Sequence, residues 1–476
     1  MGARLGLTVL CALSKLSPVD ASLIASSWQA ASAGVVMQTH STRQCKPGRF
    51  QAGAHDMASD ATILVIGTFD TKSDELAYLR EQIESQGAAA ICMDVSVLGD
   101  AAIPVEIDKH EVASAAGSSI AEAAAAGDEN SAMQIMARGA STLSSQLQAE
   151  GRIDAMVALG GTMGTDLALD CARVLPTGVP KVIVSTVAFS PLIPADRLAA
   201  DIQMVLWAGG LYGLNSLCRS ALSQAAGSVV GAARAAVPPA GDRPVIGMTS
   251  LGSSCLSYMK RLKPALEDRG FEVAIFHATG MGGMAFENIA RGGGFAAVMD
   301  FALSEIGNLY AGSVVNSGEQ RLRSAGGAGI PQIVAPGCID LIDFAGWQDI
   351  PERFLDRPFH AHNRLIKCSA FNAAERRETA RFVAERLAGA RGPTHFILPA
   401  GGIEEWDKPG EPAHDPEGLA AFCDEVRKVM KPPVILSETA AHINDQGFAD
   451  LALSILDGWI EDGTVAAPAS NKEPKS

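Results

Sequence analysis

The chain has 476 residues, of which 47% are apolar, 19% are charged and 5% are aromatic. This composition is typical of large buried cores rather than disorder, and at roughly 100–200 residues per domain the length predicts two or three domains. A net charge of −15 excludes the broad basic surface that nucleic acids or anionic membranes attract, so we expect neither as a partner. No apolar run reaches the roughly 18 residues that span a membrane.

Residues 1–56 differ in composition from the rest of the chain. They carry five basic and two acidic side chains and show no strand or helix periodicity. A basic, acid-poor N-terminus is typical of an organelle transit peptide, but this one is poor in Arg. We favour an extension that is not part of the fold, with Met57 as an alternative start. At the other end, residues 466–476 are expected to be a disordered tail.

The nine cysteines stand singly, without C-x-x-C or zinc-ligand spacing. Scattered thiols indicate a reducing compartment, so we expect a cytoplasmic protein whose cysteines are buried and free. Other potential metal ligands occur without a recognised pattern, and we predict no metal site. These are His360, His362, His442, Glu305, Asp340 and Asp445.

From Thr62 onward, short apolar strands alternate with amphipathic helices. TILVI at 62–66 predicts a buried strand, and the next helix is expected to have Ser73 as its N-cap. Gly87 is expected to end that helix. The other elements of this half are predicted strands at 88–95, 153–159 and 181–187, with helical sequence within 106–150, from Asp166, and at 213–236.

The stretch 236–242, with Pro238 and Pro239, is the best candidate for an interdomain linker. Beyond it the strand–loop–helix pattern restarts. Alternating strands and helices predict an α/β protein of two Rossmann-like domains, with parallel sheets flanked by helices. We expect an N-terminal nucleotide-binding domain at 57–236 and a C-terminal α/β domain at 243–465. The predicted strands of the second domain are 244–250, 271–277, 296–301, 330–337, 394–402 and 432–438.

Two loops of the first half could hold an anionic ligand, because ligands of open parallel sheets bind at the carboxyl ends of strands. Gly67–Lys72 offers hydroxyls and a cation, although an ordinary turn explains it equally well. Gly160–Thr165 is the sharper signal, because glycines let backbone N–H groups approach an anion and a helix follows. Neither loop matches the Walker A or the dinucleotide-binding pattern. Thr279–Gly283 is a similar glycine-containing loop before a helix in the second half, and it could hold an anion in the same way.

Several strings, in this order, resemble one known family over about residues 60–460. They are IGTFDTKSDELAYL, GGTMGT, PKVIVSTVA, GLNSLCR, FEVAIFHATGMGG, GIPQIVAPGCIDLIDF and AHINDQGFAD. The chain is similar to the Tm-one-like ATP-binding domain family, which is related to the inhibitory N-terminal half of the tomato mosaic virus resistance protein. The resemblance implies a Rossmann-like fold, a homodimer, and ATP bound by the first domain.

The resemblance also implies which residues contact the nucleotide. Two stretches match the family's nucleotide-contacting segments, and they contain Asp70, Thr71, Lys72, Gly160, Gly161, Thr162 and Met163. The chain departs from the family at Glu129, where an Arg is common, and at Val97, where a hydroxyl residue is common. A Glu near a triphosphate opposes its binding.

Three functions are compatible with these observations. The first is a nucleotide-binding enzyme of small-molecule metabolism, and the second is a nucleotide-gated binding protein without turnover. The third is a hydrolase or isomerase that uses His277 and Glu305 as acid and base in an interdomain site. The residues name no substrate, and they assign no other catalytic role.

Overall fold

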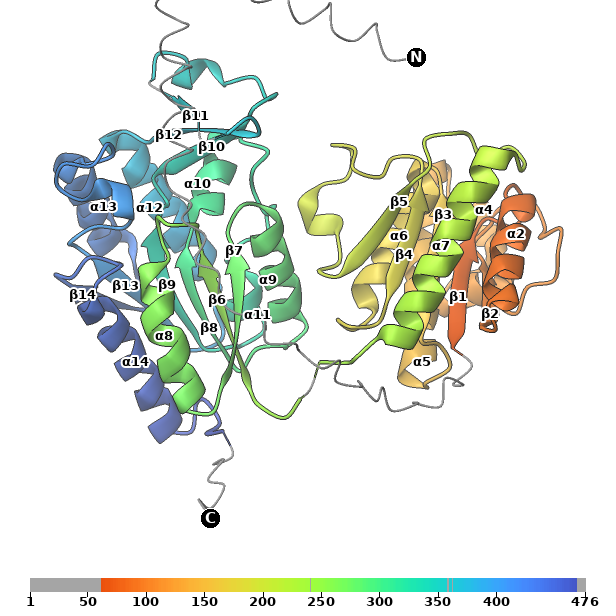
Figure 1. Cartoon of the computed structure of the whole chain (residues 1–476), viewed down its shortest axis with the longest axis horizontal. Helices are drawn as coiled ribbons and strands as arrows, with labels where there is room; N and C mark the ends of the chain where they lie inside the picture. Colours follow the sequence, from red (N-terminus) through yellow and green to blue (C-terminus); the bar gives the residue numbers. More distant parts are fainter. Residues whose placement is uncertain (1–60, 240, 358, 362, 469–476) are drawn as a thin grey trace, which may run out of the picture. The chain divides into compact units, whose positions relative to one another are not determined.

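The computed structural model describes residues 61–239, 241–357, 359–361 and 363–468. The interpretation of residues 1–56 as an extension falls outside these ranges, as do His362 and most of the segment 466–476. Two α/β halves follow one another along the chain, each with its own parallel sheet (Figure 1). No described helix is long and apolar enough to cross a membrane.

The sheet of the first half has five parallel strands in the order β2-β1-β3-β4-β5. Its central strands β1 and β3 pair directly, with Ile66 opposite Ala158. Both strands are almost fully buried, as expected where helices cover the two faces of a parallel sheet. The strands are β1 (Thr62–Gly67), β2 (Ala89–Asp94), β3 (Ala155–Gly160), β4 (Lys181–Ser185) and β5 (Ile202–Leu206).

Alternate side chains of these strands point into two separate cores. Leu64 and Met156 pack with α5 and α6 on one face, whereas Val65 and Val157 pack with α2 and α7 on the other. Figure 1 shows the helices on either side of this sheet. The helices of this half are α2 (Ser73–Ser85), α3 (Lys109–Ala115), α4 (Ile120–Ala124), α5 (Glu129–Ala149), α6 (Thr162–Val174) and α7 (Ser216–Ala235), with a 3-10 turn η2 (Ala195–Arg197).

The sheet of the second half has six parallel strands in the order β14-β13-β9-β8-β6-β7. A smaller antiparallel sheet, β10-β12-β11, is inserted between β9 and β13 in the sequence. The strands are β6 (Val245–Ser250), β7 (Glu272–His277), β8 (Ala297–Ala302), β9 (Gln332–Gly337), β10 (Leu341–Ala345), β11 (His360–Ala361), β12 (Ile366–Ala370), β13 (Thr394–Pro399) and β14 (Val434–Thr439).

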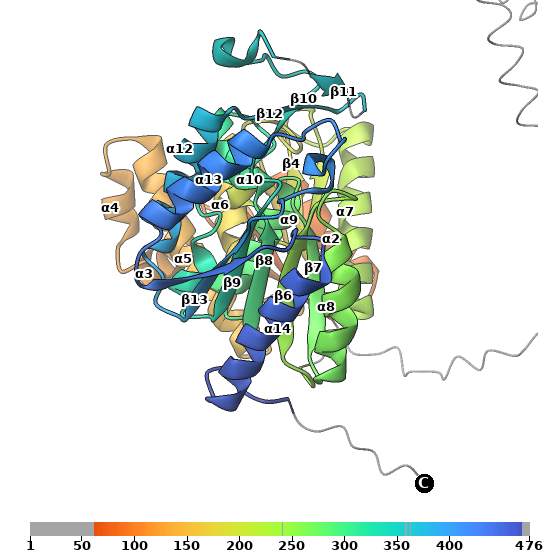
Figure 2. The same cartoon turned by 90° about the vertical axis from the view of Figure 1, so that its left-hand side faces the viewer.

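Helices again cover both faces of the six-stranded sheet. α8 and α14 pack together on one face (Figure 2). Tyr258 and Phe448 contact the strands there. α12 and α13 pack on the other face around Phe396 and Phe422. The helices are α8 (Ser257–Asp268), α9 (Met281–Arg291), α10 (Ser304–Ala311), α11 (Ser324–Gly327), α12 (Ala373–Leu387), α13 (Pro416–Val429) and α14 (Gln446–Glu461), with 3-10 turns η3 (Glu352–Phe354) and η4 (Glu405–Asp407).

The predicted fold class is therefore confirmed: the protein has two halves with parallel sheets flanked by helices. The seven cysteines among the described residues are free and buried, as expected. Two local predictions were wrong. The helix after β3 begins at Thr162, four residues before Asp166, because Gly164 is accommodated within its first turn. Lys72 rather than Ser73 is the N-cap of α2, and the Ser73 hydroxyl donates to the Phe69 carbonyl.

Candidate functional site

The two glycine-containing loops of the first half follow the paired strands β1 and β3. Because both strands are parallel, Gly67–Lys72 and Gly160–Thr165 leave the same edge of the sheet side by side. The strand order also reverses here, since β2 lies beyond β1 and β4 lies beyond β3. Ligands of open α/β sheets bind at such a switch point, so the structure brings both predicted segments to a favourable position.

The N-terminus of α6 is open toward solvent. Gly161 is its N-cap, no side chain caps the helix, and the first turn contains no acidic residue. The first intrahelical bond runs from the Thr165 N–H to the Gly161 carbonyl at 2.8 Å, so the preceding N–H groups of the first turn have no partner within the helix. Thr162 and Met163 are exposed there. Together these donors and the helix dipole favour an anion.

The glycines of this loop have different roles. A Cβ atom on Gly160 would lie 2.6 Å from the Gly164 backbone, so only glycine permits the tight turn from β3 into α6. A Cβ atom on Gly161 would meet only the Thr186 hydroxyl, at 3.9 Å, and this residue has a φ of −73°. The fold therefore does not require glycine at 161, and its missing side chain leaves space in front of the helix.

Four other helices that follow strands have an acidic residue or a side-chain hydrogen bond at the N-terminus. α2 carries Asp74 and Glu75 in its first turn, and α7 is capped by the Asn215 side chain. The first N–H of α8 donates to the Asn444 side chain at 3.2 Å. α9, predicted as a second anion site, is capped by the Glu305 carboxylate, which accepts from the N–H groups of Gly280 and Gly283 at 2.6 and 3.0 Å. The α6 N-terminus differs from all of these.

The loop after β1 is fixed by the end of β2. Asp94 accepts from the Phe69 N–H at 3.1 Å, and the Ser96 hydroxyl accepts from the Asp70 N–H at 3.1 Å. The Asp70 carboxylate in turn accepts from the Gly99 N–H at 3.1 Å. Asp70 therefore shapes the loop. Asp94 and Ser96 were missed as positioning residues, although their place at the end of an apolar strand was a usable signal.

Thr71 and Lys72 are the side chains of this loop that remain free to face a ligand. Thr71 is exposed, and its hydroxyl contacts that of Thr68 at 3.1 Å. The Lys72 ammonium lies 5.3 Å from the centre of the Tyr212 ring, and no carboxylate of the described residues forms an ion pair with it. A cation without a carboxylate partner stays available for an anion. Tyr212 was not predicted as part of this site.

The two departures from the family lie at the surface or near it. Glu129 is exposed in the first turn of α5, a helix that packs against α6. Val97 is partly buried against the first core.

A hydrogen bond of 2.7 Å between the hydroxyls of Thr165 and Ser185 joins α6 to β4. The first turn of α6 is thus held against the sheet by two buried side chains.

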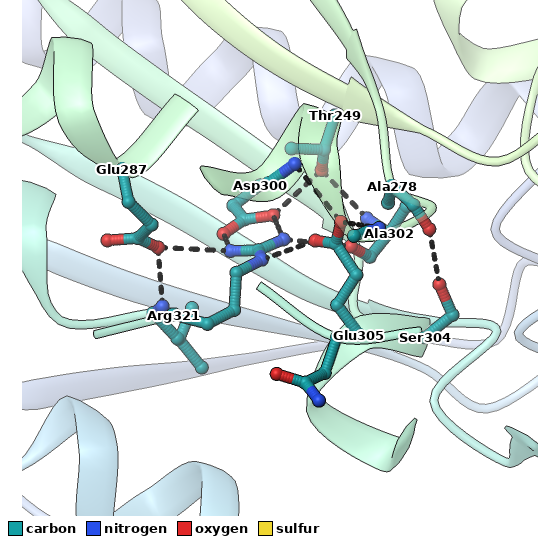
Figure 3. A network of polar contacts seen from close by, with 12 residues as sticks. Thr249, Ala278, Glu287, Asp300, Ala302, Ser304, Glu305 and Arg321 are labelled. Atoms are coloured by element: carbon teal, nitrogen blue, oxygen red, sulfur yellow. Dashed lines mark hydrogen bonds and ion pairs between the residues drawn. The ribbon is translucent and has the colours of Figure 1, made fainter. Parts of the chain in front are cut away.

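The acid–base pair considered for the second half has one buried member. His277 is exposed at the end of β7, and its Nδ1 accepts from the Gly252 N–H at 3.4 Å. Glu305 has 0% exposure, and it pairs with the Arg321 guanidinium at 2.8 Å (Figure 3). A carboxylate in that position caps α9 and balances a buried cation, so the structure gives it no access to a substrate.

Arg321 is the centre of this buried network. Its fully buried guanidinium contacts Asp300, Glu305 and Glu287, and it also donates to the Ala302 carbonyl at 3.0 Å (Figure 3). Burial raises the pKa of the Glu287 carboxyl, against the opposing attraction of Arg321. The network joins β8, α9 and α10, and its geometry is that of a structural support.

The remaining candidate metal ligands also lie apart from the first site. His442 is buried, and its Nε2 lies 3.0 Å from an Asp407 carboxylate oxygen. Asp340 pairs with Arg376 at 3.0 Å, whereas Asp445 is exposed at the start of α14. Among the described residues no group of three or more His, Cys, Asp or Glu side chains is arranged to hold a metal ion.

The fold is that of a two-domain α/β protein, and the first half has an uncapped helix N-terminus at the switch point of its sheet. Comparison with known proteins places it more narrowly. Residues 61–238 match the model of the N-terminal domain of an uncharacterised protein family (UPF0261), and residues 243–460 match the model of its C-terminal domain. The chain belongs to the UPF0261 family.

Relatives are found in bacteria and in a plant. A UPF0261 protein of Brucella melitensis is 53% identical over 85% of this chain and 96% of its own length. One of Clostridium tetani is 34% identical over 81% of this chain and 96% of its own. The tomato (Solanum lycopersicum) ToMV susceptible protein tm-1(GCR26) is 28% identical over 84% of this chain and 55% of its own length. The Tm-one-like resemblance is therefore confirmed.

Proposed function

We propose that the first domain binds ATP, with the phosphate chain at the N-terminus of α6 and beside Lys72. The observation that supports this most is the open first turn of α6 at the switch point between β1 and β3. The resemblance to an ATP-binding family agrees with this position. We further propose that the protein works in the cytoplasm as a homodimer, which sedimentation of the purified chain would test.

The physical basis of the proposal is local charge. The chain as a whole carries −15, so long-range attraction does not bring a triphosphate to the protein. At the site, however, the helix dipole and the unpaired N–H groups of the first turn supply positive potential, and Lys72 adds a full charge. Glu129 at the start of α5 opposes this potential, which limits the expected affinity.

Calorimetric titration of the full chain with ATP, ADP and AMP tests the proposal. We expect ATP to bind, and Lys72→Ala to weaken binding by about 1–3 kcal/mol, the range for a lost charged hydrogen bond. Arg152→Ala is the matched control, because Arg152 is exposed just before β3 at the opposite edge of the sheet. Absence of binding at millimolar ATP, or equal losses in the two variants, would reject the proposal.

A further inference from the structure

The loop between β5 and α7 holds two aromatic rings against glycines. The Trp207 ring occupies the place of a Cβ atom on Gly209, and a Cβ atom on Gly210 would lie 2.5 Å from the Tyr212 ring. The Trp207 indole N–H also donates to the Gly210 carbonyl at 3.3 Å. Glycine at both positions is therefore needed for the rings to lie where they do.

The same loop is anchored to α2, the helix that begins at the β1 loop. The Gly213 N–H donates to the buried Glu75 carboxylate at 2.8 Å, and Asn215 then caps α7. Tyr212 is nevertheless 94% exposed. A single exposed aromatic residue needs no explanation, but this ring lies against Gly210 and 5.3 Å from the Lys72 ammonium.

We propose that Tyr212 is the platform on which the base of a bound nucleotide stacks. This rests on the function proposed above, and it restricts the ligand to phosphates that carry a flat heteroaromatic ring. Lys72 links the proposed phosphate site to the proposed base site, because it faces the phosphate chain and lies beside the Tyr212 ring. An exposed aromatic face binds a base by stacking, and the binding tolerates different bases because each has a π-face.

A second exposed aromatic residue at this edge offers a matched control. Phe189 follows β4 and is 77% exposed, with a left-handed φ of 62°. Among the described residues no cation lies over its ring. Phe189 is therefore strongly exposed, as Tyr212 is, but has no neighbouring cation, and we assign it no part in the site.

Titrations of the full chain with ATP and with inorganic tripolyphosphate test the inference. We expect Tyr212→Leu to lower the affinity for ATP about tenfold, the scale of a lost base stack. The affinity for tripolyphosphate should not change. Tyr212→Phe should retain ATP affinity, because the ring face remains. Phe189→Leu should leave both ligands unchanged. Circular dichroism melts of each variant establish that the fold is retained.

The outcomes separate this inference from the proposed function. If Tyr212→Leu weakens both ligands equally, Tyr212 acts only by placing Lys72, and the stacking role is overturned. If Tyr212→Leu does not change the affinity for ATP, or if Phe189→Leu changes it more, the stacking role of Tyr212 is wrong. The proposed phosphate site is not affected by that result. If the unmodified chain binds tripolyphosphate as tightly as ATP, the base is not recognised. If it binds neither, both proposals fail.

Discussion

Arg321 shows how single residues sustain the second half of the protein. One guanidinium with 0% exposure contacts three acidic side chains that are themselves buried. Taking charges out of water is costly, and the cost is offset only while each partner is present. Asp300, in the middle of an apolar strand, was the one sequence signal for this network. Its partners could not be identified, because they come from segments 13, 5 and 21 residues away with no periodic relation.

Removing Arg321 is expected to destabilise the protein strongly. Arg321→Met leaves several acidic groups buried without a cation, and we expect a loss of about 3–5 kcal/mol in the free energy of unfolding, measured by urea denaturation. Arg323→Met is the control, since Arg323 lies two residues away in a partly exposed ion pair with Glu385. That pair is worth at most about 1 kcal/mol. Similar losses in both variants would show that the network is not a structural support.

The buried carboxyl group of Glu404 is expected to make the stability of the second half depend on pH. Its side chain is fully buried after β13, and burial, with Asp340 nearby, raises its pKa well above the ordinary value. Below about pH 4.3, the ordinary Glu value, both the folded and the unfolded chain hold the proton. As the pH rises further, the unfolded chain releases it first, so this residue's contribution to stability falls until the pH passes the folded pKa.

Glu404→Gln should remove this pH-dependent loss. Glutamine has nearly the same shape and remains neutral, so we expect the variant to gain more unfolding free energy relative to the unmodified protein at pH 8 than at pH 5. Urea denaturation at the two pH values measures the difference. The exposed Glu411 provides the control, because Glu411→Gln should change stability equally at both. A gain for Glu404→Gln that is independent of pH would contradict the assignment.

At the scale of elements, α6 differs from the neighbouring helices of the first half because its N-terminus has no capping side chain and no acidic residue in the first turn. We expect Gly161→Asp to raise the melting temperature slightly, since Asp is a better N-cap than Gly by a few tenths of a kcal/mol and suits the helix dipole. The same carboxylate would take the free N–H groups and repel phosphate, so ATP binding should fall by at least tenfold. A lower melting temperature with unchanged ATP affinity would contradict both the geometry and the site.

Gly161→Ala completes this test with the opposite pattern. Alanine is a poor N-cap, yet its Cβ meets nothing closer than 3.9 Å and leaves the N–H groups free. We therefore expect a lower melting temperature and at most a few-fold loss of ATP affinity. Stability and binding should thus change independently in the two variants, which a general misfolding of the loop would not produce.

The strands of both sheets could be predicted because each is a short apolar run bounded by glycine or by polar residues. β5 was missed because it lies at a sheet edge, is only partly buried, and contains Gln203. The small sheet β10-β12-β11 was missed because its pairing joins segments about 25 residues apart, across a loop without strand periodicity. The start of α6 was misplaced because Gly164 suggested a loop. Local pattern identifies buried strands, whereas edges, insertions and helix starts depend on tertiary contacts.

The whole molecule divides into two halves whose sheets share no strand, because β1–β5 come from residues 62–206 and the strands of the other two sheets from residues 245–439. The segment between them, from Ala236 to Pro239, is exposed. All residues of the proposed nucleotide site, including Tyr212, lie before this segment. The division predicted near Pro238 can therefore be tested on the first half alone.

We expect a fragment of residues 57–239 to unfold in one cooperative thermal transition and to bind ATP with the affinity of the full chain. Its sheet is complete and is covered by helices on both faces, which is the requirement for an independent core. Circular dichroism melts and calorimetric titration of the fragment and the full chain provide the comparison. A folded fragment that binds ATP at least tenfold more weakly than the full chain would show that the second domain supplies part of the site.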